Sequence, residues 1–341
     1  MNTGGRTGLS GETPGREMYC QPGMAAGEGD HYADRYWNDL PRVVSHLSRR
    51  ASGDPDQWWM DYLKRRYATP PFSRALVIAC GNGWVERELY DRRIASHFDA
   101  FDSEPAYLEE ARRLAGGRAI DYYQAEFTDF RVQEEHYDLV INVAALHHAR
   151  RLYETVQRIA NSMTEDGLFV NWDYVGPSRN QYSNRHLALM TQVNLGLPMR
   201  FRSPYPLRFT IRNVVESDPT EAAHSSEIRR AVGQYFDIVE WKDLGGGIAY
   251  QILWNNISHY ECDDPEAAAI LERLLVLDEE YTRTGRVRSL FAFVVARRRS
   301  GRSGLRARYC RYVKEPVRET LSRVLMRDVY VHDILHRYGF L

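Results

Sequence analysis

Two neighbouring histidines offer the clearest proton chemistry in this sequence. His147 and His148, together with Asn142, come at or just after the apolar run YDLVINV (137–143). Imidazole titrates near neutral pH, so either histidine could accept a proton from a bound molecule. One ring could instead pack against a cleft while the other bonds to the backbone. We therefore take both histidines as candidate catalytic residues.

A second pair of polar side chains ends another apolar run, GLFVNWDYV (167–175). Asp173 could accept a hydrogen bond from a hydroxyl of a ligand, and Tyr174 could lie beside the reacting atoms. The alternative is that Asp173 caps a turn and Tyr174 forms a cleft wall. Both residues join the histidines as catalytic candidates.

The segment 176–225 carries many polar groups without a strand pattern, and we expect it to form an inserted substrate cap. Four polar residues in SDPTEAAHSSEI (217–228) could converge on a polyhydroxylated ligand, or belong to ordinary helix starts: Asp218, Glu221, His224 and Glu227. The segment is also locally basic. Either an acidic or phosphorylated acceptor or a solvated face would explain its four arginines: Arg179, Arg200, Arg202 and Arg208. No single element spaces three metal ligands together, so we predict no metal site.

A glycine turn follows the first apolar run, in ACGNGWVE (79–86). No Gly-Lys pair follows, which excludes the phosphate loop of nucleotide hydrolases. The NAD fingerprint needs a third glycine where this chain has Glu86, and a carboxylate there would repel a pyrophosphate. S-adenosylmethionine (SAM), which has no phosphate, is the remaining common occupant of such a turn.

The distance from this turn to the next carboxylate supports a nucleoside ligand. Asp102 lies 21 residues after Gly81, close to the spacing of about 20 expected for a ribose-binding carboxylate. Glu126, after a third strand, could take the adenine amino group. The predicted cofactor-binding residues are Ala79, Cys80, Gly81, Asn82, Gly83, Asp102, Ser103, Glu126, Phe127 and Asn142.

The elements that must position these groups alternate between strands and helices. Strands are predicted at 75–79, 98–102, 120–126, 137–143, 167–175, 235–244 and 289–298. Helices are expected after Trp84, over the run EPAYLEEARRLA (104–115), on the face Leu152–Met163 and over 264–284. Such alternation predicts an α/β fold with a parallel, doubly wound, Rossmann-like sheet, whose ligands bind at the carboxyl ends of the strands.

These motifs together resemble the core of class I SAM-dependent methyltransferases, from Arg74 to about Trp172. In that resemblance LVIACGNGWVE is the first motif, FDAFDSEPAYLEEAR the ribose-binding region and YQAEF the adenine region. FRVQEEHYDLVINVAALHH and MTEDGLFVNWDY match the fourth and fifth strands. DYVGPSRNQYS, SDPTEAAHSSEI and FAFVVARR resemble a bacterial subgroup that often acts on glycans or secondary metabolites. The chain departs from the pattern at Val77, usually acidic, and at Ala79, usually glycine.

The changes in composition predict the domain organisation. Residues 1–30 are rich in Gly, Ser, Thr and Pro and are expected to be disordered. An aromatic helical lid or brace covers 31–70, the methyltransferase domain 71–298, and a basic linker with a C-terminal helix 299–341. The stretch 297–318 holds nine Arg/Lys and one Glu, which indicates either a solvated joint or a surface for an acidic partner.

The bulk composition narrows the class of protein. The four cysteines form no cluster, no run of 18 apolar residues occurs and no signal-peptide pattern opens the chain, so we expect a cytoplasmic protein without a membrane span. No aromatic-interleaved nucleic-acid motif accompanies the basic stretch. The predicted function is methyl transfer from SAM to a hydroxyl of a small polar, glycan or secondary-metabolite acceptor. The alternatives are a non-catalytic SAM-binding scaffold and an NAD-dependent oxidoreductase; the oligomeric state stays open.

Overall fold

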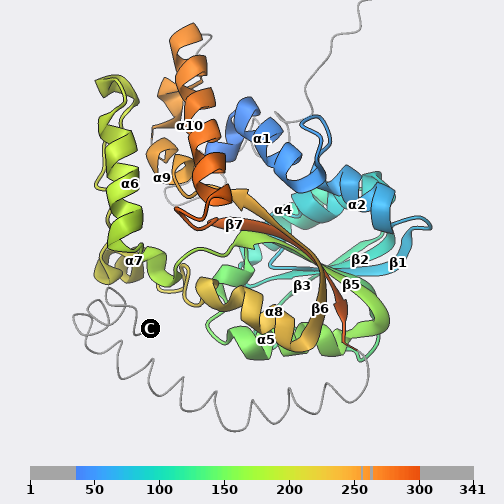
Figure 1. Ribbon diagram of the computed structural model, residues 1–341. Coiled ribbons are helices and arrows are strands. Elements are labelled where there is room, and N and C mark those ends of the chain that lie inside the picture. The colour runs from blue at the N-terminus through green and yellow to red at the C-terminus, as the bar shows by residue number, and fades with distance from the viewer. Residues whose placement is uncertain (1–35, 255, 262–263, 300–341) are drawn as a thin grey trace, which may run out of the picture.

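A seven-stranded sheet forms the centre of the protein, seen in the computed structural model, which describes residues 36–254, 256–261 and 264–299 (Figure 1). Its strand order is β3-β2-β1-β4-β5-β7-β6. The strands are β1 (Phe72–Ile78), β2 (Ala95–Asp102), β3 (Ile120–Gln124), β4 (Tyr137–Val143), β5 (Met163–Tyr174), β6 (Phe236–Gly245) and β7 (Phe291–Arg298). The order reverses between β1 and β4, which is where sheets of this kind bind ligands.

Helices cover both faces of the sheet. One face carries α1 (Pro41–Ser52), α2 (Trp59–Tyr67), α3 (Trp84–Asp91), α4 (Pro105–Ala115) and α10 (Pro265–Arg283). The other carries α5 (Leu152–Ser162) and α8 (Ile228–Tyr235), drawn below the sheet in Figure 1. Side chains alternate between the two layers: Ala75 and Val77 face the first core, Leu76 and Ile78 the second. Continuous apolar strands are what a sheet buried on both faces requires.

The observed elements confirm the predicted doubly wound fold, with two differences. Met163, expected on the preceding helix face, is the first residue of β5. The parallel pairing expected from the alternating units holds for β1 to β5, and the second difference is that β7 runs antiparallel to both of its neighbours. β7 begins at the edge where β6 ends, and the Leu290 N–H donates to the Gly245 carbonyl there at 2.9 Å. A strand that starts at that edge has to run back between β5 and β6.

Two tryptophans at the start of α2 pack on the sheet. Trp58 lies against Trp172 of β5, with ring centroids 5.2 Å apart. Trp59 is fully buried, and its ring centroid lies 6.1 Å from those of both Trp172 and Phe293. The two tryptophans therefore belong to the same hydrophobic core as the sheet residues that they contact.

The segment after β5 is helical and irregular. It contains α6 (Asn184–Leu195) and α7 (Ile211–Ser217), with α9 (Ala249–Leu253) following β6. Short 3-10 turns occur at η2 (Trp37–Asp39), η3 (Leu146–His148), η4 (Ser178–Asn180), η5 (Met199–Phe201), η6 (Ser225–Glu227) and η7 (Ile257–His259). Segment 1–30 and all but the first residue of 299–341 lie outside the described residues. Within the described part, no helix is long and apolar enough to cross a membrane.

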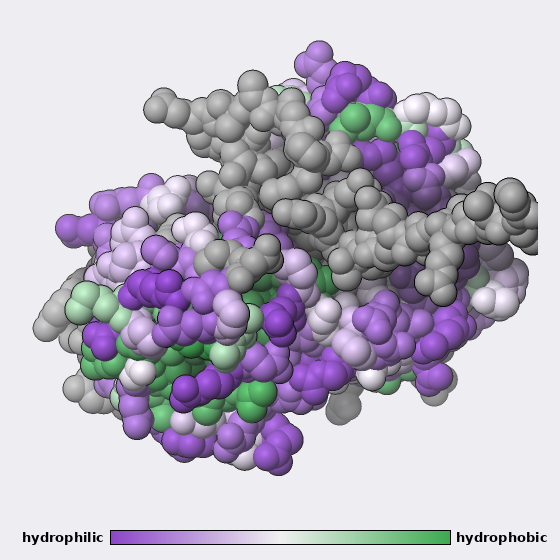
Figure 2. All heavy atoms as spheres, turned by 90° about the horizontal axis from the view of Figure 1, so that it is seen from above, coloured by the Kyte–Doolittle hydropathy of each residue, from purple (hydrophilic) through white to green (hydrophobic). Residues whose placement is uncertain are grey.

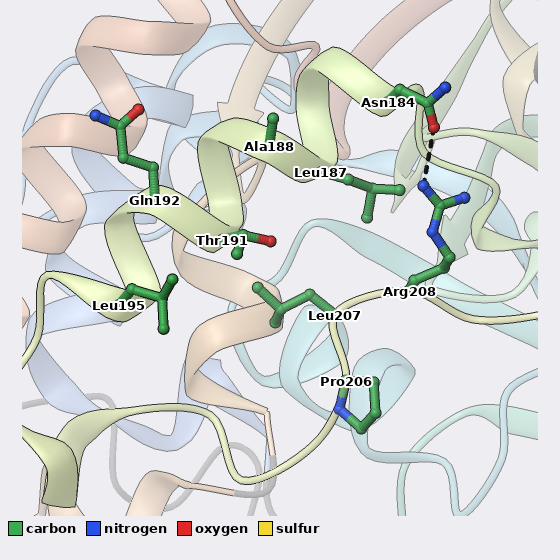
Figure 3. A pocket seen from close by; sticks show the side chains of 9 residues that line it. All are labelled: Asn184, Leu187, Ala188, Thr191, Gln192, Leu195, Pro206, Leu207 and Arg208. Carbon is green, nitrogen blue, oxygen red and sulfur yellow. Dashed lines mark hydrogen bonds between the residues drawn. The ribbon is translucent and has the colours of Figure 1, made fainter.

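An apolar groove of about 700 Å³ lies along α6 (Figure 3). It is lined by Asn184, Leu187, Ala188, Thr191, Gln192, Leu195, Pro206, Leu207 and Arg208. Figure 2 shows the molecule from above, with apolar side chains gathered on one side. In Figure 1 this is the side on which α6 and α10 lie. Leu195, Met199 and Val276 are more than half exposed. None of the predicted catalytic or cofactor-binding residues lines this groove.

Candidate active site

The turn after β1 forms a cradle built on left-handed backbone. Ala79, Gly81 and Gly83 have φ values of 48°, 56° and 80°. A Cβ atom on Gly83 would lie 2.5 Å from the Tyr122 hydroxyl and 2.9 Å from the Ala111 Cβ. Glycine at this position therefore serves both the backbone conformation and the close packing. The four residues of the turn, 80–83, are all buried.

Asp102 links the ends of β1 and β2. One carboxylate oxygen accepts the Gly81 N–H at 2.8 Å and the other accepts the Glu104 N–H at 2.9 Å. Asp102 is buried, yet a carboxylate has about four acceptor positions, so one remains on each oxygen. This arrangement fits two neighbouring hydroxyls of a ribose. The predicted spacing between Gly81 and Asp102 thus corresponds to a direct contact.

Glu86 lies beneath the same cradle, in the first turn of α3. Its carboxylate is fully buried, and an oxygen lies 2.8 Å from where a Gly83 Cβ would stand. Burial raises the pKa of Glu86 to about 7, against the smaller opposing effects of its backbone and Tyr122 hydrogen bonds. The Glu86 carboxylate, which packs against Gly83 of the turn, therefore titrates near neutral pH.

The other predicted cofactor residues lie around this turn and the next two strand ends. Cys80 and Asn82 are buried within the turn, and Ser103 is exposed after β2. Glu126 is exposed after β3, with its backbone N–H donating to Asp129 at 2.7 Å, and Phe127 is half-buried. Their contact with a cofactor stays a prediction.

A buried polar network occupies the carboxyl ends of β4 and β5. The Asn142 side-chain amide donates to Asn171 and to Asp173, both at 2.7 Å. Asp173 has no exposed surface, and its other oxygen lies 2.6 Å from His147 Nδ1. Asp173 is therefore the centre of a buried network rather than an exposed turn cap. Within the described part of the chain, the Asn142 side-chain oxygen has no hydrogen-bond partner.

His147 lies between two carboxylates. Its Nδ1 faces Asp173, and its Nε2 lies 3.6 Å from a Glu221 oxygen. Burial alone would lower the pKa of His147, but the charges and hydrogen bonds of Asp173 and Glu221 outweigh burial and raise the pKa to about 10. An isolated buried carboxylate is costly, so the imidazolium stabilises both acids.

His148 contacts the same cap segment from the other side. Its Nδ1 lies 2.9 Å from the Thr220 hydroxyl and 3.4 Å from Asp218, and its Nε2 lies 3.9 Å from Glu221. Burial, followed by the charge of His147, lowers the pKa of His148 to about 4. The pair therefore holds one charged and one neutral imidazole near pH 7.

The remaining candidates support this cluster or lie apart from it. Tyr174 is buried, its hydroxyl donates to the Pro177 carbonyl at 3.2 Å, and its ring meets that of His147 edge-on at 6.1 Å. Asp218 and Glu221 converge on the histidines, whereas His224 and Glu227 follow as the N-cap and last residue of η6.

The cap arginines contact protein groups. Arg179 is buried and donates to the carbonyls of Pro219 and Glu221 at 3.1 and 2.9 Å. Arg200 pairs with Asp264 and Glu266. Arg202 donates to the Leu197 carbonyl and Arg208 to the Asn184 side chain, the bond drawn in Figure 3. Each arginine thus has a structural partner, and an anionic acceptor is not needed to explain them.

Sequence reasoning missed three residues of the site. Asn171 lies inside β5, where its amide joins the Asn142 network. Thr220 holds His148, and Asn180 donates to Glu221 at 3.3 Å. A polar side chain in the interior of an apolar strand was the available signal for Asn171, because buried polar groups need partners.

Comparison with known proteins agrees with this geometry. Residues 75–167 match the family described as methyltransferase domain. The malonyl-[acyl-carrier protein] O-methyltransferase of Anoxybacillus flavithermus is 28% identical over 31% of this chain and 40% of that protein. The malonyl-[acyl-carrier protein] O-methyltransferase of Bacillus anthracis is 23% identical over 32% of this chain and 40% of that protein. The chain thus spans about two fifths of the length of the curated relatives it matches.

A solved structure with a similar fold is a SAM-dependent methyltransferase from Mesorhizobium loti. It is 16% identical, covers 67% of this chain and 91% of its own, and has a TM-score of 0.42. The glycine cradle, the buried Asp102 with free acceptor positions and the family match agree on one ligand. The chain carries a class I methyltransferase domain whose cofactor is SAM.

Proposed function

We propose that this protein transfers the methyl group of SAM to a hydroxyl of a small polar acceptor, such as a glycan or a secondary metabolite. The observation that carries the proposal is the network joining Asp173, His147 and Glu221 at the sheet edge that also bears the cradle. Asn142, a member of that network, is the register partner of Ile78, the last residue of β1 before the cradle.

The residues of the network have distinct roles in this proposal. When bound, SAM supplies an electrophilic methyl group: its S–CH3 bond breaks, the electron pair stays on sulfur, and the acceptor O–CH3 bond forms. The proton of the acceptor hydroxyl then needs a base. His148 is the neutral imidazole with its Nε2 toward Glu221, so it accepts that proton. His147, held charged by Asp173, attracts the Glu221 carboxylate that lies beside His148.

The curated relatives support an oxygen acceptor, since both are named O-methyltransferases. Their names specify a malonyl group on an acyl carrier protein, and a carrier-bound acyl group is a second acceptor class to include in any panel. The half-exposed His148 and Glu221 support an acceptor that reaches the network from solvent.

The proposal is tested in two steps with the full chain. Calorimetry with SAM should first show stoichiometric binding, and its absence would remove the basis of the proposal. Single-turnover transfer from methyl-labelled SAM to hydroxylated acceptors should then produce labelled product and S-adenosylhomocysteine. His148→Ala should keep SAM affinity and lose transfer, whereas His97→Ala, on the outer part of β2, should keep both.

One observation favours the non-catalytic alternative. Val77, at the position where the family resemblance leads one to expect an acid, is buried and offers no polar contact to the methionine part of SAM. A SAM-binding scaffold would tolerate that loss. Tight SAM binding without methyl transfer to any acceptor in the panel would support this alternative.

A further inference from the structure

His147, His148 and Glu221 present three ligand atoms to one point in the active-site cluster. We propose that these three side chains bind a divalent transition-metal ion, with the zinc ion as its probe. One ligand atom from each of the three side chains lies within 4.8 Å of the other two. Nε2 of each histidine is the nitrogen that faces the Glu221 carboxylate. The sequence predicted no metal because no single element holds three ligands, but here they come from η3 and from the cap segment near residue 221.

The separations of these atoms match a small coordination sphere. Glu221 lies 3.6 Å from Nε2 of His147 and 3.9 Å from Nε2 of His148. Atoms about 2.1 Å from a tetrahedral ion lie about 3.4 Å from one another. The Glu221 oxygen would therefore have to approach each histidine nitrogen by only a few tenths of an ångström. Two imidazoles and a carboxylate are a ligand set that zinc and iron(II) favour, and the ion would displace the proton that His147 carries near pH 7.

Both histidines are oriented for this role by their other ring nitrogen. His147 Nδ1 contacts Asp173 at 2.6 Å, and His148 Nδ1 contacts the Thr220 hydroxyl at 2.9 Å. Metal-binding histidines characteristically bond a carboxylate or another oxygen through the nitrogen that does not bind metal. Asn180 likewise donates to the Glu221 oxygen that faces away from His147, at 3.3 Å. Each ligand is thus fixed by a neighbour that is not itself a ligand.

Three protein ligands leave an open coordination position. His148 and Glu221 each keep 31% of their side-chain surface exposed, so solvent or an acceptor can reach that position. A bound ion would lower the pKa of a coordinated hydroxyl. In the loaded protein the ion would thus replace His148 in activating the acceptor. This consequence depends on the proposed function, whereas metal binding itself depends only on the cluster.

A second group of potential ligands serves as the comparison. His97, Asp99 and Asp121 also bring three ligand atoms together. However, both Asp99 oxygens accept bonds from Arg74, at 2.8 and 3.0 Å, and the Asp121 side chain is 70% exposed. A guanidinium already neutralises this group, so it is a poor cation site and a matched control.

The experiment measures metal binding without reference to methyl transfer. The full chain, purified without a histidine tag and stripped with a chelator, is titrated with Zn²⁺ by calorimetry and analysed for bound metal by mass spectrometry. Co²⁺ provides a second readout through the absorption bands of a histidine-ligated ion. We expect one ion per chain. The affinity for Zn²⁺ should fall by at least about tenfold in Glu221→Gln and in His148→Ala. Thr220→Val should weaken binding less, through the orientation of His148.

The control decides between the cluster and adventitious binding. His97→Ala should bind Zn²⁺ as the unaltered protein does, and circular dichroism of the metal-free variants establishes that each is folded. Unchanged affinity in both Glu221→Gln and His148→Ala, or loss of the ion in His97→Ala, would overturn the proposal. Metal binding by a chain that transfers no methyl group would leave the site standing and reject only the proposed function.

Discussion

Glu86→Gln is expected to change how the stability of the protein depends on pH. Glu86 is fully buried beneath the glycine cradle, and burial raises its pKa from 4.5 to about 7. A folded state with a raised carboxyl pKa binds more protons than the unfolded chain between these two values. The free energy of unfolding therefore falls as the pH rises through this window. Glutamine has nearly the same shape as the protonated acid and does not titrate.

The magnitude follows from the two pKa values. A difference from 4.5 to about 7 corresponds to about 3 kcal/mol, at about 1.4 kcal/mol for each pH unit. The contribution is complete below about pH 4.5 and lost above about pH 7, and most of the change, about 2–3 kcal/mol, falls between about pH 5 and pH 8. That is a large fraction of the 5–15 kcal/mol, roughly, that stabilises a typical domain.

The assay compares the two proteins by urea unfolding at several pH values between about 5 and 8. Other titrating groups affect both proteins alike, so the difference in unfolding free energy between them isolates Glu86. Relative to Glu86→Gln, the unaltered protein should lose about 2–3 kcal/mol of unfolding free energy across this range. Glu109→Gln, on the exposed side of α4, removes a negative charge without disturbing the cradle and should not reproduce the effect. Stability curves that stay parallel for Glu86→Gln would refute the reasoning.

Three further changes test the cradle and the brace. Asp102→Ala removes the acceptor of the Gly81 and Glu104 N–H groups and should weaken SAM binding by on the order of 100-fold in calorimetry; equal affinity would contradict the ribose assignment. Gly83→Ala should destabilise the protein in thermal unfolding clearly more than Gly53→Ala, because both have left-handed backbone but only Gly83 would place its Cβ against other atoms. Trp59→Ala should lower the unfolding free energy by about 3–5 kcal/mol, and a small effect would show α2 to be a detachable lid.

The strands and the cradle could be predicted because their signals are local. Each buried strand is a short apolar run, and the turn after β1 needs glycine where φ is positive. The contact between Gly81 and Asp102 was also accessible, since it joins the ends of two neighbouring parallel strands. The direction of β7 was not, because apolar runs of parallel and antiparallel strands look alike within a buried sheet.

The approach of Glu221 to the two histidines had no local signal. The segments are more than 70 residues apart and meet through backbone bonds: Ala223 N–H donates to the His147 carbonyl at 3.2 Å, and Arg179 N–H to the Ala222 carbonyl at 2.7 Å. Periodicity describes single elements and contains no information on which loops pair. The polar density of the cap was visible, but its partner was not.

The buried charge of Asp173 connects the fold to the chemistry proposed for it. A carboxylate with no exposed surface would be strongly destabilising without compensation, yet β5 places it at the sheet edge beside the cradle. Asn142 and His147 provide that compensation through bonds of 2.7 and 2.6 Å. The same bonds fix which ring nitrogen of His147 faces Glu221. The orientation of the reactive cluster is therefore coupled to stability, because the contacts that allow Asp173 to be buried also direct Nε2 of His147 toward Glu221.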